Sequence, residues 1–192
     1  MGSNVMKAKV NKVTIRIVLG DLYSLKVAAV VNSTNTDLTL TLELIAKAGI
    51  ELQREVIQIG YCDVASAVIT TSGLLAAQGV EKIIHAVGPR WGEGSERGKL
   101  ANVVLECLRL AESNMIKSIA FPPISVGANG YPVENCAKTM LTQIIDYTFE
   151  DLKYLQTVVI CLSDDTVADV FRLEFAHQLA DLSEEGDAQV QV

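Results

Sequence analysis

Hydrophobic residues follow two alternating patterns along this chain. Short apolar runs rich in β-branched residues, each bounded by turn residues, predict strands that are buried on both faces. The first run instead alternates apolar and polar residues, which is typical of a strand with one solvent-facing side. The predicted strands are residues 10–18, 27–31, 67–71, 82–87, 118–124 and 157–162.

Apolar residues spaced three or four positions apart occur in four further segments and predict amphipathic helices. Asp164 and Asp165 precede the last of these segments and suit the N-cap of a helix. Buried strands that alternate with such helices predict an α/β fold, with a mainly parallel sheet covered on both faces. The predicted helices are residues 42–59, 100–111, 136–145 and 167–179.

Ligands of such sheets bind beyond the carboxyl ends of the strands. Candidate chemistry is therefore expected directly after each apolar run. The residues found there are Asp21 after the first run, Asn32 and Asn35 after the second, the stretch S-V-G-A-N-G at 125–130 after the fifth, and Ser163 after the last.

Each of these groups has a structural and a functional interpretation. Glycines allow a tight connection between strand and helix, but they also let successive backbone N–H groups surround a phosphate. Asp21 suits a turn or an N-cap, yet a carboxylate also accepts hydrogen bonds from the exocyclic amine of a base. Asn32 and Asn35 suit side-chain turns, yet amides also bond sugar hydroxyls. Taken together, the groups indicate a nucleoside diphosphate site.

The composition narrows the class of protein. The 192 residues, 49% hydrophobic and 20% charged, fit one globular domain. The net charge of −7 disfavours a broad nucleic-acid surface, because neutralising phosphates needs clustered Lys and Arg. The sequence has no run of about 18 apolar residues and no apolar signal core. We therefore expect no membrane association and an intracellular protein, cytoplasmic or nuclear.

Cysteine spacing disfavours metal chemistry. Cys62, Cys107, Cys136 and Cys161 lie far apart and form no C-x-x-C pair, so we expect free thiols and no metal site. No pair of carboxylates and no Cys–His pair stands among the strand-end residues, so we assign no catalytic residue.

Four motifs together resemble the macrodomain family. They are G-D-L at 20–22, V-N-x-x-N at 31–35, IIHAVGPRW at 83–91 and IAFPPISVGANGYP at 119–132, in the order found in macrodomains. The resemblance extends from about residue 10 to residue 182, and the GANGYP variant is most similar to the macrodomain of macro-type histone variants. It implies a three-layer α/β/α fold with a mixed, mainly parallel central sheet.

The resemblance also implies ADP-ribose as the ligand and assigns the strand-end residues to it. Asp21 would hold the adenine amino group with Leu22 beside it, and Asn35 would meet the distal ribose, with Asn32 also in the ligand-binding set. No cofactor is implied, and the expected partner is ADP-ribose or an ADP-ribosylated protein. The loop that would surround the diphosphate is Ser125, Val126, Gly127, Ala128, Asn129 and Gly130.

Three departures from the family pattern bear on activity. Hydrolytic macrodomains usually follow V-N-x-x-N with three glycines, whereas residues 36–43 of this chain contain none. Ser163 stands where an aromatic residue commonly stacks on adenine, and Asn129 replaces an aromatic residue often found beside the distal ribose. Because hydrolysis needs a tightly positioned ribose and water, these departures favour binding over turnover.

Three hypotheses for function follow. The leading one is a module that binds ADP-ribose or a terminal ADP-ribosyl group. The others are a hydrolase of ADP-ribosyl or O-acetyl-ADP-ribose linkages, and a degenerate macrodomain that serves only as a protein interaction module. We expect a monomer with one domain over residues 7–182, an N-terminal extension or cloning remnant at 1–6, and a flexible acidic tail at 183–192.

Overall fold

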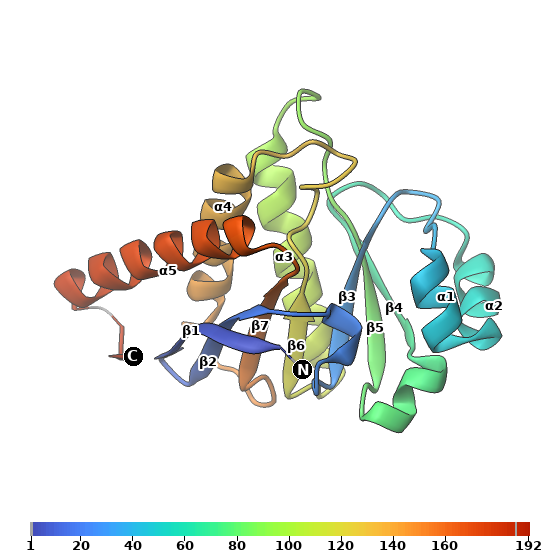
Figure 1. The fold of residues 1–192 in the computed structure, drawn as a ribbon, viewed down its shortest axis with the longest axis horizontal. Helices are drawn as coiled ribbons and strands as arrows, with labels where there is room; N and C mark the ends of the chain where they lie inside the picture. The colour runs from blue at the N-terminus through green and yellow to red at the C-terminus, as the bar shows by residue number, and fades with distance from the viewer. Residues whose placement is uncertain (1, 187) are drawn as a thin grey trace.

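A mixed sheet forms the centre of the molecule (Figure 1). The structure is a computed structural model that describes residues 2–186 and 188–192. Within these residues the sheet has eight strands in the order β4-β5-β3-β6-β7-β2-β1-β8. The strands are β1 (Ser3–Val10), β2 (Val13–Leu19), β3 (Ala29–Thr34), β4 (Ala67–Thr71), β5 (Lys82–Val87), β6 (Ser118–Phe121), β7 (Thr157–Leu162) and β8 (Val190–Gln191).

The five central strands, β5, β3, β6, β7 and β2, are parallel to one another. The outer strands are antiparallel, with β4 paired to β5 and β1 paired to both β2 and β8. The carboxyl ends of the parallel strands therefore meet at one end of the sheet. This arrangement confirms the predicted mixed, mainly parallel sheet.

Helices cover both faces of the sheet and complete the three predicted layers (Figure 1). On one face α3, α4 and α5 pack over the larger hydrophobic cluster, and on the other α1 and α2 pack over the smaller one. Short 3₁₀ helices, η1 and η2, follow β2 and β4. The elements are α1 (Leu42–Ala48), α2 (Ile50–Ile59), α3 (Glu96–Ser113), α4 (Val133–Tyr147), α5 (Asp165–Glu185), η1 (Leu22–Ser24) and η2 (Gly73–Gln78).

The central strand β7 shows why its apolar run is continuous. Val158 and Ile160 belong to the larger cluster, whereas Val159 and Cys161 belong to the smaller one. Side chains of a strand point alternately to its two faces, so a strand covered on both sides needs apolar residues at successive positions.

The predicted first strand, residues 10–18, is wrong at its start. Val10 ends β1 and Val13 begins β2, so the two strands form a hairpin. Asn11 supplies the positive φ of the turn, 54°, which Asn adopts more readily than most residues. Residues 3–6, expected in an N-terminal extension, are part of β1, and Val190 and Gln191 of the expected tail form β8. Met1 and Asp187 lie outside the described residues.

The single helix predicted over residues 42–59 is also wrong, because Gly49 divides it. Gly49 has φ +85°, which ends α1 and redirects the chain into α2. The 3,4 spacing of apolar residues continues through Gly49 in the sequence. In the structure α1 and α2 are separate helices, so these residues do not form one continuous face. Leu42, at the start of the predicted face, is accordingly 85% exposed.

The predicted cap of the last helix and the predicted free thiols agree with the structure. The Asp164 carboxylate accepts a hydrogen bond from the Val167 amide at 3.0 Å and caps α5. All four cysteines are free and buried. In the part of the chain that the structure describes, no helix is both long and apolar enough to cross a membrane.

Candidate functional site

Loops that follow β3, β5 and β6 meet at the carboxyl end of the parallel strands (Figure 1) and enclose a cavity of about 430 Å³. We call it the first cavity. Its lining is rich in hydroxyl, amide and backbone groups, which suits a polar ligand. The lining residues are Ser33, Thr34, Asn35, Thr39, Leu40, Thr41, Arg90, Pro123, Ser125, Gly127, Ala128 and Asn129.

The loop between β6 and α4 has an unusual backbone. Ser125 is buried and has φ +66°, and Gly130 has φ +69°. Two hydrogen bonds close the loop on itself, from the Gly130 amide to the Gly127 carbonyl at 3.0 Å and from the Tyr131 amide to the Ser125 carbonyl at 2.9 Å. Among the described residues, no acceptor takes a hydrogen bond from the amides of residues 127, 128 and 129. Successive free amides of this kind form an anion-binding concavity.

Asn129 joins this loop to the segment after β5. Its side-chain amide donates to the Gly88 carbonyl at 3.3 Å and to the Ser125 hydroxyl at 3.4 Å. Its own carbonyl accepts a hydrogen bond from the Trp91 amide at 2.9 Å. Asn129, which replaces an aromatic residue of the family pattern, thus fixes the two walls of the cavity relative to each other.

Asn35 organises the loop that stands in place of the three glycines. Its Oδ1 accepts hydrogen bonds from the amides of Asp37 at 3.1 Å and Thr39 at 3.2 Å, and from the Thr39 hydroxyl at 3.1 Å. Leu38, between them, has φ +57° and inserts its side chain into the smaller hydrophobic cluster. Since Oδ1 is engaged, the Nδ2 donors are the part of the Asn35 side chain that no hydrogen bond occupies among the described residues.

Asp21 lies at the end of the neighbouring strand pair, outside the first cavity. Its carboxylate caps η1 by accepting from the Tyr23 amide at 3.2 Å, and it also accepts from the Ser24 hydroxyl at 2.7 Å. Lys47 of α1 forms an ion pair with it at 3.1 Å. The hydrogen bond from Ser24 is the main cause that lowers the pKa of Asp21, so this group is an ionised acceptor at neutral pH.

Leu22 and Ser163 lie near Asp21. Leu22 is the first residue of η1, and Ser163 directly follows β7, which pairs with β2. The Gly20 amide donates to the Leu162 carbonyl at 2.9 Å, so the two chain segments leave the sheet side by side. Ser163 is exposed.

Asn32 has a different environment from Asn35. It is buried within β3, and its Nδ2 lies 3.1 Å from Nδ1 of His85 on β5. The other ring nitrogen of His85 lies 2.9 Å from the hydroxyl of Thr70 on β4. Burial lowers the pKa of His85 to about 4, so its ring is neutral near pH 7. Asn32 therefore faces the interior of the sheet and does not line the first cavity.

Residues 31–140 match the family model of the Macro domain. The chain belongs to the macrodomain family. A Macro domain-containing protein of Caldanaerobacter subterraneus is 38% identical to it over 146 residues, which cover 71% of this chain and 82% of that protein. The O-acetyl-ADP-ribose deacetylase of Salmonella typhimurium is 34% identical over 164 residues, covering 79% and 89%.

Solved macrodomain structures have the same fold. The Oceanobacillus iheyensis macrodomain with ADP superposes with a TM-score of 0.85 at 25% identity and covers 94% of this chain and 99% of that chain. A mutant of the same protein, solved with ADPR, has a TM-score of 0.83 at 25% identity and covers 91% and 98%. These relatives do not support the finer resemblance to macro-type histone variants, which stays a prediction.

In this macrodomain the structure brings five of the predicted ligand residues to one cavity: Asn35, Ser125, Gly127, Ala128 and Asn129. Val126 and Gly130 belong to the same loop, but Val126 packs against the larger hydrophobic cluster. Asp21, Leu22 and Ser163 lie at the adjacent strand ends, β2 and β7.

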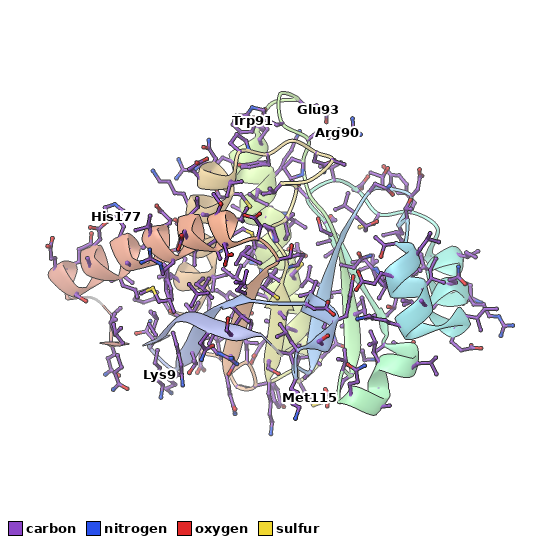
Figure 2. The ribbon with its side chains drawn as sticks, in the orientation of Figure 1. Lys9, Arg90, Trp91, Glu93, Met115 and His177 are labelled. Atoms are coloured by element: carbon purple, nitrogen blue, oxygen red, sulfur yellow. The ribbon has the colours of Figure 1, made fainter. Side chains whose placement is uncertain are left out.

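Sequence reasoning missed Arg90 as a member of this site. Arg90 follows β5, lines the first cavity, and has no carboxylate within 4 Å in the described ranges 2–186 and 188–192. Figure 2 shows it projecting from the loop at the end of the sheet. The strand-end rule that selected the other residues would have found it, had it been applied after residues 82–87 as well.

The site offers no metal-binding or nucleophilic cluster. In the described part of the chain no three His, Cys, Asp or Glu residues lie close enough to hold a metal ion. Asp37 of the 36–43 loop does not line the first cavity but borders a separate one together with Leu38 and Leu40. The groups that line the first cavity are hydroxyls, amides, backbone groups and the guanidinium of Arg90.

Proposed function

We propose that this macrodomain binds ADP-ribose, either free or as the terminal ADP-ribosyl group of a modified protein. The observation that carries the proposal is that residues 127–129, whose amides have no acceptor among the described residues, line the same cavity as Arg90. Backbone amides and an arginine together supply what a diphosphate needs, donors at close range and a positive charge. The relatives solved with ADP and ADPR support the same ligand class.

The remaining groups fit the two ends of this ligand. Asn35 presents Nδ2 donors to the first cavity beside the hydroxyls of Thr39 and Thr41, which suits the distal ribose. Asp21, at the adjacent strand end, suits the adenine amino group. The proposal requires no metal and no further cofactor.

A hydrolase is the second candidate, because the Salmonella relative at 34% identity is named an O-acetyl-ADP-ribose deacetylase. The loop around Asn35 favours binding instead. It contains no glycine, and Leu38 anchors it in the hydrophobic interior, so it does not approach a phosphate as a glycine loop would. Incubation with O-acetyl-ADP-ribose and with a mono-ADP-ribosylated protein separates the two candidates, since only a hydrolase releases product over time.

Calorimetric titration with ADP-ribose tests the binding proposal, and Gly127→Glu is the informative variant. A Cβ added at Gly127 meets no atom within 4 Å, and the φ of Gly127 lies outside the left-handed region, so the variant is expected to fold normally. The new carboxylate lies in the diphosphate loop and repels the ligand. We expect micromolar binding by the wild type and at least a hundredfold loss in the variant.

The matched control is Gly98→Glu. Gly98 lies on α3 with open space around it, so this variant adds the same charge to the protein outside the first cavity. ADP-ribose affinity should stay within about twofold of the wild type. Undiminished binding in Gly127→Glu would place the ligand elsewhere. If the folded wild type did not bind ADP-ribose, the hypothesis of a macrodomain that serves only as a protein interaction module would be favoured.

A further inference from the structure

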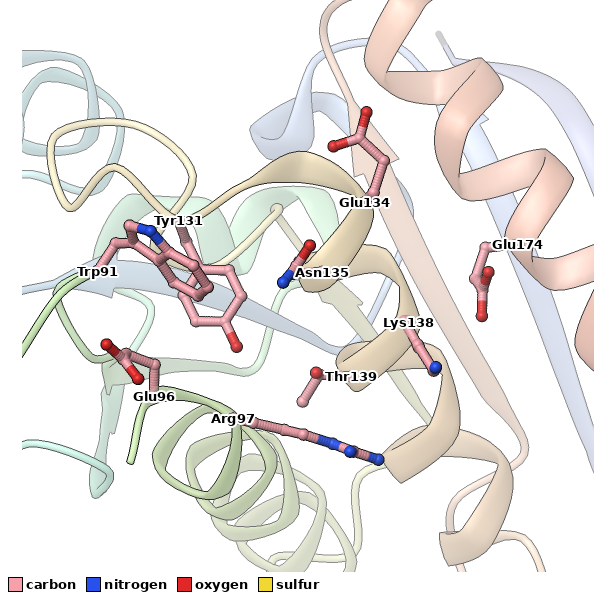
Figure 3. A pocket seen from close by; sticks show the side chains of 9 residues that line it. All are labelled: Trp91, Glu96, Arg97, Tyr131, Glu134, Asn135, Lys138, Thr139 and Glu174. Carbon is pink, nitrogen blue, oxygen red and sulfur yellow. The ribbon is translucent and has the colours of Figure 1, made fainter. Parts of the chain in front are cut away.

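A second cavity lies beyond Asn129, on the far side of the two joined loops. Its volume is about 430 Å³, and it opens between the starts of α3 and α4 and the side of α5 (Figure 3). Trp91 and Tyr131 form one wall, and α4 forms the floor with Thr139 (Figure 3). The inference drawn from this cavity rests on the proposed function.

The aromatic wall is exposed enough to receive a partner. The rings of Trp91 and Tyr131 meet edge to face, with centroids 5.1 Å apart and planes at 65°. Tyr131 is 3% exposed, but Trp91, the single tryptophan of the chain, is 47% exposed. A tryptophan held in place by a buried aromatic neighbour is the type of residue that carries binding energy at protein interfaces.

The two cavities share a wall, so one ligand is able to occupy both. Arg90 lines the first cavity and its neighbour Trp91 lines the second. Figure 2 shows both residues on the loop at the end of the sheet. The Trp91 amide donates to the Asn129 carbonyl, and the side chain of Asn129 lines the first cavity, where the distal ribose is proposed to lie. A group attached to a ribose in the first cavity would therefore have Trp91 in its neighbourhood.

Charge indicates what the second cavity accepts. Glu96 is engaged by the amides of Gly92 and Gly94, at 2.8 and 3.1 Å, but Glu134 and Glu174 stand at the rim (Figure 3). Two cations, Arg97 and Lys138, line the same cavity. A mixed rim of this kind suits a polypeptide, which brings charges and hydrogen-bonding groups of both signs.

The groove continues between α4 and α5, where the carboxylates outnumber the cations. Lys138 and Glu174 line both this continuation and the second cavity. Farther along, the groove is bordered by Asp146, Asp181 and Glu185. These carboxylates repel the phosphates of a further ADP-ribose unit and attract Lys and Arg side chains.

We infer that the second cavity and its continuation dock the polypeptide that carries the ADP-ribosyl group. The ADP-ribosyl group occupies the first cavity, and the residues next to the modified one cross Trp91. Lys or Arg residues in that segment lie along the groove between α4 and α5. The module thereby reads the modification together with a cationic protein sequence.

The test compares four probes on the wild type and on Trp91→Ala. The probes are free ADP-ribose, an ADP-ribose dimer, and mono-ADP-ribosylated peptides flanked either by lysines or by glutamates. We expect the lysine-flanked peptide to bind the wild type about tenfold more tightly than free ADP-ribose, and Trp91→Ala to abolish this gain. Binding of free ADP-ribose should not change, because the backbone bond from residue 91 to Asn129 is retained.

The matched control is Phe149→Ala, which removes an aromatic side chain of similar exposure at a distant cavity. It should leave all four affinities unchanged. Equal wild-type affinity for free ADP-ribose and for the lysine-flanked peptide would overturn the inference, as would a Trp91→Ala loss shared by free ADP-ribose. If only the ADP-ribose dimer bound more tightly than free ADP-ribose, the second cavity would be assigned to an ADP-ribose polymer and not to a polypeptide. Absence of any ADP-ribose binding would overturn the proposed function and, with it, this inference.

Discussion

The Asp21 carboxylate has nearly all of its acceptor capacity in use. A carboxylate offers about four lone-pair sites. Tyr23 takes one on Oδ1, and Ser24 and Lys47 take both on Oδ2. One site is left, on Oδ1, which has room for one further donor, and in the proposed function that donor is the exocyclic amine of adenine. We therefore expect Asp21 to prefer adenine over a base that presents a carbonyl at this position.

Asp21→Asn tests this selectivity with ADP and IDP as ligands. An amide in place of the carboxylate turns a pure acceptor into a donor as well, and hypoxanthine presents a carbonyl where adenine presents an amine. We expect the wild type to prefer ADP by about tenfold, and the variant to lose that preference. Calorimetry measures both affinities.

A matched variant checks that the effect is local. Asp63→Asn makes the same chemical change in an exposed loop after α2 and should keep the wild-type ratio of the two affinities. An unchanged ADP preference in Asp21→Asn would show that Asp21 does not contact the base.

Three strands are tied together by a buried polar chain. Thr70 donates its only hydroxyl proton to the Thr71 carbonyl at 3.0 Å, so it accepts from Nε2 of His85. Nδ1 of His85 then accepts from the Asn32 amide. This fixes one neutral tautomer and links β3, β5 and β4 by side chains in addition to the backbone ladder. Protonation of His85 would turn Nδ1 into a donor that faces the Asn32 amide donor, and would thus break the chain of bonds.

Stability should consequently fall in mild acid. The folded pKa of His85, about 4, lies below its ordinary value of 6.5, so the unfolded state binds the proton first as pH falls. The stability that comes from keeping His85 neutral is fully present above about pH 6.5 and is lost as pH falls to 4. Over this range the free energy of unfolding should fall by about 3 kcal/mol. Urea unfolding between pH 7.5 and 4 measures it.

Other groups also titrate in this range, so the comparison uses variants. The free energy of unfolding of the wild type should approach that of His85→Gln as pH falls, because Gln cannot titrate. His177→Gln, which changes the exposed histidine of α5, should follow the wild-type curve. Parallel curves for the wild type and His85→Gln would contradict the assigned neutral state.

Most elements were predictable from the sequence because their apolar patterns reflect real faces. The run at residues 157–162 is continuous since β7 is covered on both sides. The errors fall where one residue changes the backbone direction without interrupting the pattern. Asn11 turns the chain within an alternating run, and Gly49 breaks a helix whose spacing continues on both sides. Periodicity records which residues are apolar, not where φ changes sign.

Across the whole molecule, charge opposes the proposed ligand. The net charge of −7 repels a diphosphate, so binding depends on local positive groups. Arg90 is such a group at the first cavity, and it has no acidic partner among residues 2–186 and 188–192. From the sequence, the glycine loop was identified as an anion site but Arg90 was not. The arginine becomes apparent once the loops after β3, β5 and β6 are placed together.

Arg90→Gln should weaken ADP-ribose binding by about tenfold at low salt, mainly through slower association. The difference from the wild type should shrink as ionic strength rises, because exposed charges are screened. Stopped-flow titration over a series of NaCl concentrations measures both effects. Arg54→Gln is the control, since Arg54 pairs with Glu51 at 2.9 Å on α2, and its rates should match the wild type. A salt-independent difference would mean that Arg90 acts by shape alone.

Leu38 makes the loop beside the first cavity inseparable from the protein interior. Its left-handed backbone costs about 1–2 kcal/mol, and burial of its side chain offsets that cost. Glycine at position 38 would remove the backbone cost and leave a hole. Glycines at positions 39–41 would make the loop backbone more flexible, but the side chain of Leu38 would still have to stay packed in the smaller hydrophobic cluster. Replacing this loop by a triple-glycine loop would therefore require a change in the packing of the protein interior as well as in the loop.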